Sequence, residues 1–135
     1  MKRFIIYHLS FILAAQLLAQ SWKGEFYNAD EDVRLRIDLY EASITAPNYD
    51  FLGKLNGYLT GNLYDAWFLT TFEIKGDVAT CKFSNDLGSE TQTICFSFDD
   101  NGNLIYETKG GNAIRRNEHG KWVKLPSKLL FKRKK

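Results

Sequence analysis

The chain has 135 residues, of which 44% are hydrophobic and 15% aromatic, and its 18 basic and 16 acidic residues give a formal net charge of +2. This composition indicates one domain with a packed core, and it excludes an intrinsically disordered chain. Only two cysteines and two prolines are present, which excludes a disulfide-dense miniprotein and a proline-rich linker.

The first residues differ in character from the rest of the chain. Two basic residues precede an apolar run from Phe4 to Leu18, and the small residue Ala19 follows. This order is typical of a secretory signal peptide, and we favour it over an uncleaved anchor because a membrane-spanning helix needs about 20 apolar residues. We therefore expect a signal peptide at residues 1–19, cleaved near Ala19, and one exported domain at residues 20–135. That domain, periplasmic or extracellular, would have no membrane span.

Charge is distributed unevenly over the expected mature chain. The segment from Arg115 onward carries nine basic residues and one acidic residue, whereas residues 20–114 carry seven basic and 15 acidic residues. Such asymmetry can indicate an anionic partner. We favour the interpretation that the basic end lies beside the acidic body and is neutralised there. The alternative is an adaptor that binds anions through this C-terminal end.

The residues after the leader predict short β-strands separated by turns. In the clearest segment, Val33–Tyr40, apolar and mostly charged residues alternate, which indicates a half-buried strand of an antiparallel sheet. The other strand-like segments are 21–27, 66–74, 78–83, 91–98, 104–108, 113–115, 121–125 and 129–132. Eight to ten short strands and no amphipathic helix predict an all-β fold, a single antiparallel meander barrel. The 17 aromatic residues of the mature chain suffice to fill a small barrel.

Three glycines, Gly53, Gly57 and Gly61, recur at a spacing of four. Within a strand this spacing places them on one face, where they allow bending or close approach of another backbone. Alternatively, Asn56-Gly57 is a two-residue hairpin turn, for which that dipeptide is a strong signal. The sequence does not separate these two interpretations.

The two cysteines flank the turn expected at residues 84–90. Cys81 and Cys95 each lie seven residues from Gly88, so a hairpin centred there places them directly opposite each other. In an oxidising compartment this pairing predicts a cross-strand disulfide. Closing such a loop would stabilise the fold by about 3 kcal/mol in the chain-entropy model.

Catalysis finds little support in the residue types. One histidine, His119, remains after the leader, and with two oxidised cysteines no nucleophile–base pair is left. Asp99–Asn103 resembles part of a calcium loop but lacks the closing glutamate, so it predicts a hairpin turn. We expect no enzyme, no catalytic residues, no cofactor and no metal. The alternative is a cell-envelope hydrolase with carboxylates at the barrel mouth.

Basic and aromatic residues meet near the C-terminus. Arg115, Arg116, Lys121 and Trp122 could contact an anion such as a glycan, as such groups do in binders of charged polymers. We favour the interpretation that they protect an exposed hairpin edge. No nucleic-acid partner is expected.

The chain resembles small secreted bacterial lipocalin-like (calycin-type) domains of unknown function. Three features carry the resemblance, and they are the meander of hairpins, the basic-aromatic end and the segment Trp22-Lys23-Gly24-Glu25-Phe26. The resemblance covers about residues 21–133. Lipocalins open with Gly-x-Trp, whereas this chain has the order Trp22-x-Gly24.

The resemblance implies that Trp22 closes one end of the barrel against a basic residue of the last strand, Arg133 or Lys132. Gly24 would let the first strand bend around it. The resemblance also implies binding of an apolar ligand or inhibition of an extracellular enzyme. We therefore expect an exported, non-enzymatic binding module for a small apolar ligand or an extracellular protein.

Overall fold

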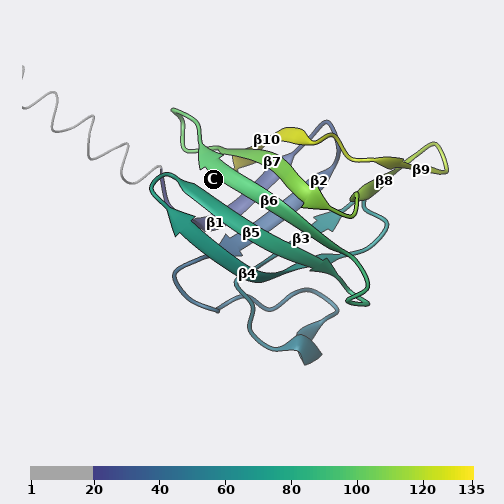
Figure 1. Cartoon of the computed structure of the whole chain (residues 1–135), viewed down its shortest axis with the longest axis horizontal. Helices are drawn as coiled ribbons and strands as arrows, with labels where there is room; N and C mark the ends of the chain where they lie inside the picture. Colours follow the sequence, from purple (N-terminus) through teal and green to yellow (C-terminus); the bar gives the residue numbers. More distant parts are fainter. Residues whose placement is uncertain (1–19) are drawn as a thin grey trace, which may run out of the picture.

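The computed structural model describes residues 20–135, and the expected signal peptide at residues 1–19 lies outside this described part. Ten strands are present within it, and the all-β meander barrel expected from the sequence is confirmed (Figure 1). The strands that close the barrel are β1 (Lys23–Asn28), β2 (Val33–Asp38), β3 (Gly57–Gly61), β4 (Trp67–Lys75), β5 (Val78–Asn85), β6 (Thr91–Phe98), β7 (Leu104–Gly111) and β10 (Lys128–Arg133). A separate two-stranded sheet consists of β8 (Arg115–Glu118) and β9 (Lys121–Lys124).

The barrel is an antiparallel meander that is closed by pairing of the last strand, β10, with the first strand, β1. Strands β1 to β7 pair in chain order, and β10 then lies between β7 and β1. The β8–β9 hairpin extends from one end of the barrel (Figure 1). The long connection between β2 and β3 contains one short 3-10 turn, Asp50–Leu52.

Period-two patterns place apolar side chains inside the barrel. In β2, Val33, Leu35 and Ile37 are buried while Arg34 and Arg36 are exposed, as the alternation predicted. Successive side chains of a strand point to opposite faces of the sheet, so one face of β2 meets the core and the other meets solvent.

Aromatic side chains fill the barrel interior. Phe26, Phe83, Phe96, Tyr106 and Phe131 come from five different strands, and each is at most 1% exposed. Neighbouring rings of this set lie 5.6–6.3 Å apart between centroids, within the range of favourable aromatic pairs. An eight-stranded barrel is just wide enough for such a filling.

The position of β3 supports the interpretation that the repeated glycines lie in a strand, not in a hairpin turn at Asn56-Gly57. Gly57 begins this strand and is not part of a hairpin turn. A Cβ at Gly57 would lie 2.8 Å from the carbonyl oxygen of Arg36, and one at Gly61 would collide with the carbonyl of Asp32. Close approach of the β2 backbone therefore requires both glycines. Gly53 lies outside the strand and follows the 3-10 turn.

The predicted disulfide between Cys81 and Cys95 is wrong, because both cysteines are free. Thr80 pairs with Cys95, and Cys81 pairs with Ile94, so the register differs by one residue from the expected one. Neighbouring residues of a strand point to opposite faces. The Cys81 side chain is consequently buried in the core, whereas Cys95 is partly exposed.

The physical reason for this register lies in the turn between β5 and β6. The backbone amide of Asn85 donates to the carbonyl of Glu90, which leaves four residues in the loop. The Asn85 side chain also accepts a hydrogen bond from the Glu90 amide and donates one to Ser89. These bonds centre the hairpin between Leu87 and Gly88.

Candidate functional site

The seam at which the barrel closes brings together residues from both ends of the described chain. β1 and β10 share two residue pairs, Phe26 with Arg133 and Tyr27 with Lys132. The Arg133 side chain donates hydrogen bonds to three backbone carbonyl oxygens, those of Ser21 (2.6 Å), Lys23 (2.9 Å) and Gly102 (3.2 Å). Its guanidinium carbon lies 4.5 Å from the centre of the Phe26 ring.

Burial lowers the pKa of the Arg133 guanidinium, since water that would hydrate the charge is displaced. The carbonyl dipoles of the three acceptors replace that water. Gly24 makes this arrangement possible, because a Cβ there would lie 2.6 Å from Nη1 of Arg133. The first and last strands are thus joined by one partly buried cation.

Trp22 lies at this end of the barrel, 7% exposed, with its ring centroid 4.3 Å from that of Phe98. Its backbone amide donates to the Tyr40 hydroxyl. Arg133 holds the carbonyls on either side of Trp22, so the structure brings together Trp22, Gly24 and Arg133 of the sequence-predicted set. Lys132 points outward and lines a groove on the outer face.

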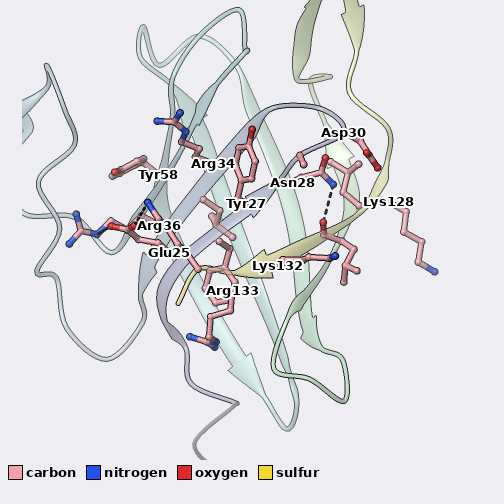
Figure 2. A pocket seen from close by; sticks show the side chains of 16 residues that line it. Glu25, Tyr27, Asn28, Asp30, Arg34, Arg36, Tyr58, Lys128, Lys132 and Arg133 are labelled. Atoms are coloured by element: carbon pink, nitrogen blue, oxygen red, sulfur yellow. Dashed lines mark hydrogen bonds and ion pairs between the residues drawn. The ribbon is translucent and has the colours of Figure 1, made fainter.

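This groove, about 900 Å³ in volume, runs along the outer face of β10, β1 and β2 (Figure 2). It lies where β1 and β10 diverge after their two residue pairs. Beyond them, the side-chain amide of Asn28 donates to the carbonyl of Leu130 at 2.9 Å and takes the place of a backbone bond. The gap between the strands leaves Leu129 and Leu130 as apolar lining.

The lining of the groove is predominantly basic. Six basic side chains and two acidic side chains contribute to it, and they are Arg34, Arg36, Lys128, Lys132, Arg133, Lys134, Glu25 and Asp30. Clefts lined by one sign of charge focus the electrostatic potential and raise the local concentration of oppositely charged ligands. The groove therefore favours anions.

Strand register arranges two of the cations around an aromatic ring. Tyr27 pairs with Lys132 of β10 on one side and with Arg34 of β2 on the other. All three lie on the outer face, and Figure 2 shows Tyr27 and Arg34 side by side. The Tyr27 hydroxyl donates to Asp32 at 2.8 Å, and this bond raises the pKa of Tyr27. We call Lys132, Tyr27 and Arg34 the open row.

In the next row of the outer face, two basic side chains share one carboxylate. Glu25 lies 3.8 Å from Arg36 and 3.8 Å from the Lys134 ammonium. In residues 20–135, by contrast, no ion pair joins Arg34, Lys128 or Lys132 to an acid. We call Lys134, Glu25 and Arg36 the closed row.

The basic-aromatic cluster expected near the C-terminus is divided by the fold. Arg116 forms an ion pair with Glu31, and Arg115 lies 3.5 Å from Glu90. These contacts support the interpretation that part of the basic end is neutralised by the acidic body.

The aromatic member of that cluster, Trp122, packs edge-on against Tyr64 at 4.9 Å. Arg115 lies over the same Tyr64 ring, at 5.4 Å. Lys121 stands exposed beside Trp122 at the tip of the hairpin, opposite Glu118. Two of the four predicted anion contacts, the arginines, are thus already paired with acids.

Two carboxylates share a smaller hollow of about 160 Å³ at the surface. Asp65 has a raised pKa, first because burial disfavours its charge and then because Asp86 is close. Asp86 accepts a hydrogen bond from Tyr49 at 3.0 Å. Asp65 and Asp86 are thus two neighbouring carboxylates at the surface.

The Asp99–Asn103 segment is the hairpin turn that the sequence predicted. Oδ1 of Asp99 accepts hydrogen bonds from the backbone amides of Asn101 and Asn103. A group of three metal-ligating side chains is not found within residues 20–135.

Sequence reasoning missed Tyr27, Asn28, Arg34 and Lys128 as parts of the groove. The outward position of Arg34 was visible in the alternation of β2, but Lys128 and Lys132, which line the same groove, come from a strand about a hundred positions away. No local pattern reveals that pairing.

Comparison of the chain with protein-family models, with curated proteins and with solved structures found no match. Within residues 20–135, no helix is long and apolar enough to cross a membrane. The class that the fold defines is the closed, eight-stranded antiparallel β-barrel.

Proposed function

We propose that this protein is an exported, non-enzymatic binding module that recognises an anionic partner in the groove along β10, β1 and β2. The observation that carries the proposal is the charge of that groove, with six basic and two acidic side chains in its lining. Three of the basic side chains have no acidic partner within residues 20–135, so their charge is available to a ligand.

The filled interior favours recognition at the outer surface over transport of an apolar ligand. The largest buried side chains occupy the inside of the barrel, and the two hollows described above lie at the surface. The lipocalin-like relationship is part of the proposal, supported by eight antiparallel strands and by Trp22 at the barrel end. Export is supported by the leader sequence.

Binding to polyanions tests this function. Protein expressed from the full chain should bind heparin or poly-L-glutamate with an affinity that falls linearly with salt on a logarithmic scale. Replacing Arg34 and Lys132 together by alanine should weaken binding about 10–100-fold, since each lost charged contact contributes about 1 kcal/mol or more.

The matched control replaces Lys75 and Lys82, which are exposed on β4 and β5 across the barrel. Affinity should then change less than twofold. Equal losses in the two double variants would show non-specific attraction, and absence of binding to every polyanion would refute the proposed function.

A further inference from the structure

We infer that the anionic partner is a charged polysaccharide whose sugar rings pack on Tyr27 and whose carboxylate or sulfate groups lie beside Arg34 and Lys132. This inference rests on the proposed function and narrows the class of ligand. It is carried by the contrast between the open row and the closed row of the groove.

The open row combines one ring with two cations at a defined spacing. Adjacent strands lie about 4.8 Å apart, so the backbones that carry Lys132 and Arg34 are separated by about 10 Å across Tyr27. This separation is close to the length of a disaccharide repeat. A polysaccharide with an anionic group on at least every second residue would place one such group near each cation and a ring over the tyrosine between them.

Tyr27 is suited to contact a sugar ring. Its side chain lines the groove, and the residue is 37% exposed. The hydrogen bond from its hydroxyl to Asp32 limits rotation of the ring, so little side-chain entropy is lost on binding. A tyrosine presents an apolar ring with a polar tip, which matches the C–H face and the hydroxyl groups of a sugar.

The concave shape of the site argues against two other anionic partners. A flat bilayer surface does not enter a groove, so lipid headgroups would meet its rim and not Tyr27. A peptide could add to the sheet only at an unpaired strand edge, and the β10 edge facing the groove is occupied by Tyr27 and by the Asn28 amide.

Glu25 sets a boundary within the groove. Its carboxylate lies 3.8 Å from both Arg36 and Lys134, so it offsets one of their two positive charges and competes with a ligand anion for both cations. Ligand anions should therefore bind along the open row, and Glu25 acts as a specificity-determining residue because it restricts the number of cations available.

The first test compares probes that differ in the presence of rings. Heparin and polygalacturonate are ring-bearing polyanions with sulfate and carboxylate or with carboxylate only, and poly-L-glutamate is a polyanion without rings. At equal ionic strength and equal charge concentration, the protein should bind at least one of the two glycans about tenfold more tightly than poly-L-glutamate. The preferred glycan identifies the anionic group.

Variants of Tyr27 then isolate the ring. Tyr27→Leu should weaken glycan binding about tenfold, in line with the loss of an aromatic stacking platform, and should change poly-L-glutamate binding less than twofold. Tyr27→Phe retains the ring but loses the bond to Asp32, so it should weaken glycan binding less than Tyr27→Leu does. Circular dichroism of each variant checks that the barrel is intact.

The second test looks for tighter glycan binding by a variant, because a misfolded variant would lose binding and not gain it. Glu25→Gln frees Arg36 and Lys134 and should raise glycan affinity about three- to tenfold. The matched control, Glu73→Gln, frees Lys75 from a similar exposed ion pair on β4 and should leave the affinity unchanged.

Three outcomes would overturn the inference. Equal or tighter binding of poly-L-glutamate that is insensitive to Tyr27→Leu would identify an acidic polypeptide as the partner. Binding to phosphatidylglycerol vesicles without binding to either glycan would identify a lipid surface. In both cases the proposed anion-binding function stands, whereas failure to bind any of these probes refutes that function as well.

Discussion

At the scale of single residues, side-chain chemistry in this protein depends on which face of a strand a residue occupies. Cys81 and Cys95 have the same functional group, yet one is buried in the core and the other partly exposed. Burial raises the pKa of Cys81 to about 12, with the proximity of Cys95 as a second cause. The thiolate is the reactive form of cysteine, so the two thiols should differ greatly in reactivity.

Thiol labelling of unreduced native protein checks this difference. At pH 8 a thiol with a pKa of about 12 is ionised in about one molecule in ten thousand. Cys95 should therefore be labelled and Cys81 protected, and both should react after unfolding in urea. Complete absence of labelling before reduction would indicate a disulfide and contradict the free cysteines of the structure.

At the scale of elements, the contact between β1 and β10 depends on a glycine in one strand and a partly buried arginine in the other. The Arg133 guanidinium occupies the space that a Cβ at Gly24 would need. The register of this seam covers two residue pairs, so side-chain hydrogen bonds from Arg133 and Asn28 contribute much of its stability.

Substitutions at this seam have predictable and coupled effects. Gly24→Ala should lower the free energy of unfolding by about 1–3 kcal/mol, because it displaces the guanidinium from the Lys23 carbonyl. Gly110→Ala is the matched control, with a similar backbone φ and nothing within 4 Å of the new Cβ. Urea titration measures both values.

A double variant separates this mechanism from simple crowding. Arg133→Met should cost about 3 kcal/mol, since it removes charged hydrogen bonds to three backbone carbonyls. If Gly24→Ala acts by displacing Arg133, the loss in the double variant should be smaller than the sum of the single losses. Full additivity would contradict the role that we assign to Gly24.

At the scale of the whole molecule, the meander becomes a closed barrel only through its last strand. β10 fills the position between β7 and β1 and contributes the buried Phe131 to the interior. Without β10, two strand edges and the aromatic interior would meet water. Cooperative folding should therefore require the whole domain.

Unfolding of the intact and shortened chains tests this dependence. The intact domain should unfold in one transition with a heat-capacity change of about 1.4–1.7 kcal/mol/K, from about 12–15 cal/mol/K per residue. Deletion of residues 128–135 should abolish the cooperative transition, whereas deletion of Lys135 alone should leave the midpoint unchanged. A shortened chain with a normal midpoint would show that closure is dispensable. Scanning calorimetry provides both measurements.

Sequence alone determined the properties that depend on neighbours along the chain. The alternation in Val33–Tyr40 and the turn at Asp99–Asn103 predicted an all-β meander barrel. These predictions succeeded because strand periodicity and turn chemistry are local.

Only the tertiary structure decided which face of the sheet each cysteine occupies and which distant strands lie side by side. A one-residue difference in the Asn85–Glu90 turn placed Cys81 and Cys95 on opposite faces, because the bonds of Asn85 to Ser89 and Glu90 centre the turn between Leu87 and Gly88 and not on Gly88. The groove arises where Tyr27 and Arg34 meet Lys132 across the closing seam. Its chemistry depends on pairing between strands about a hundred residues apart, which the order of residues along the chain does not reveal.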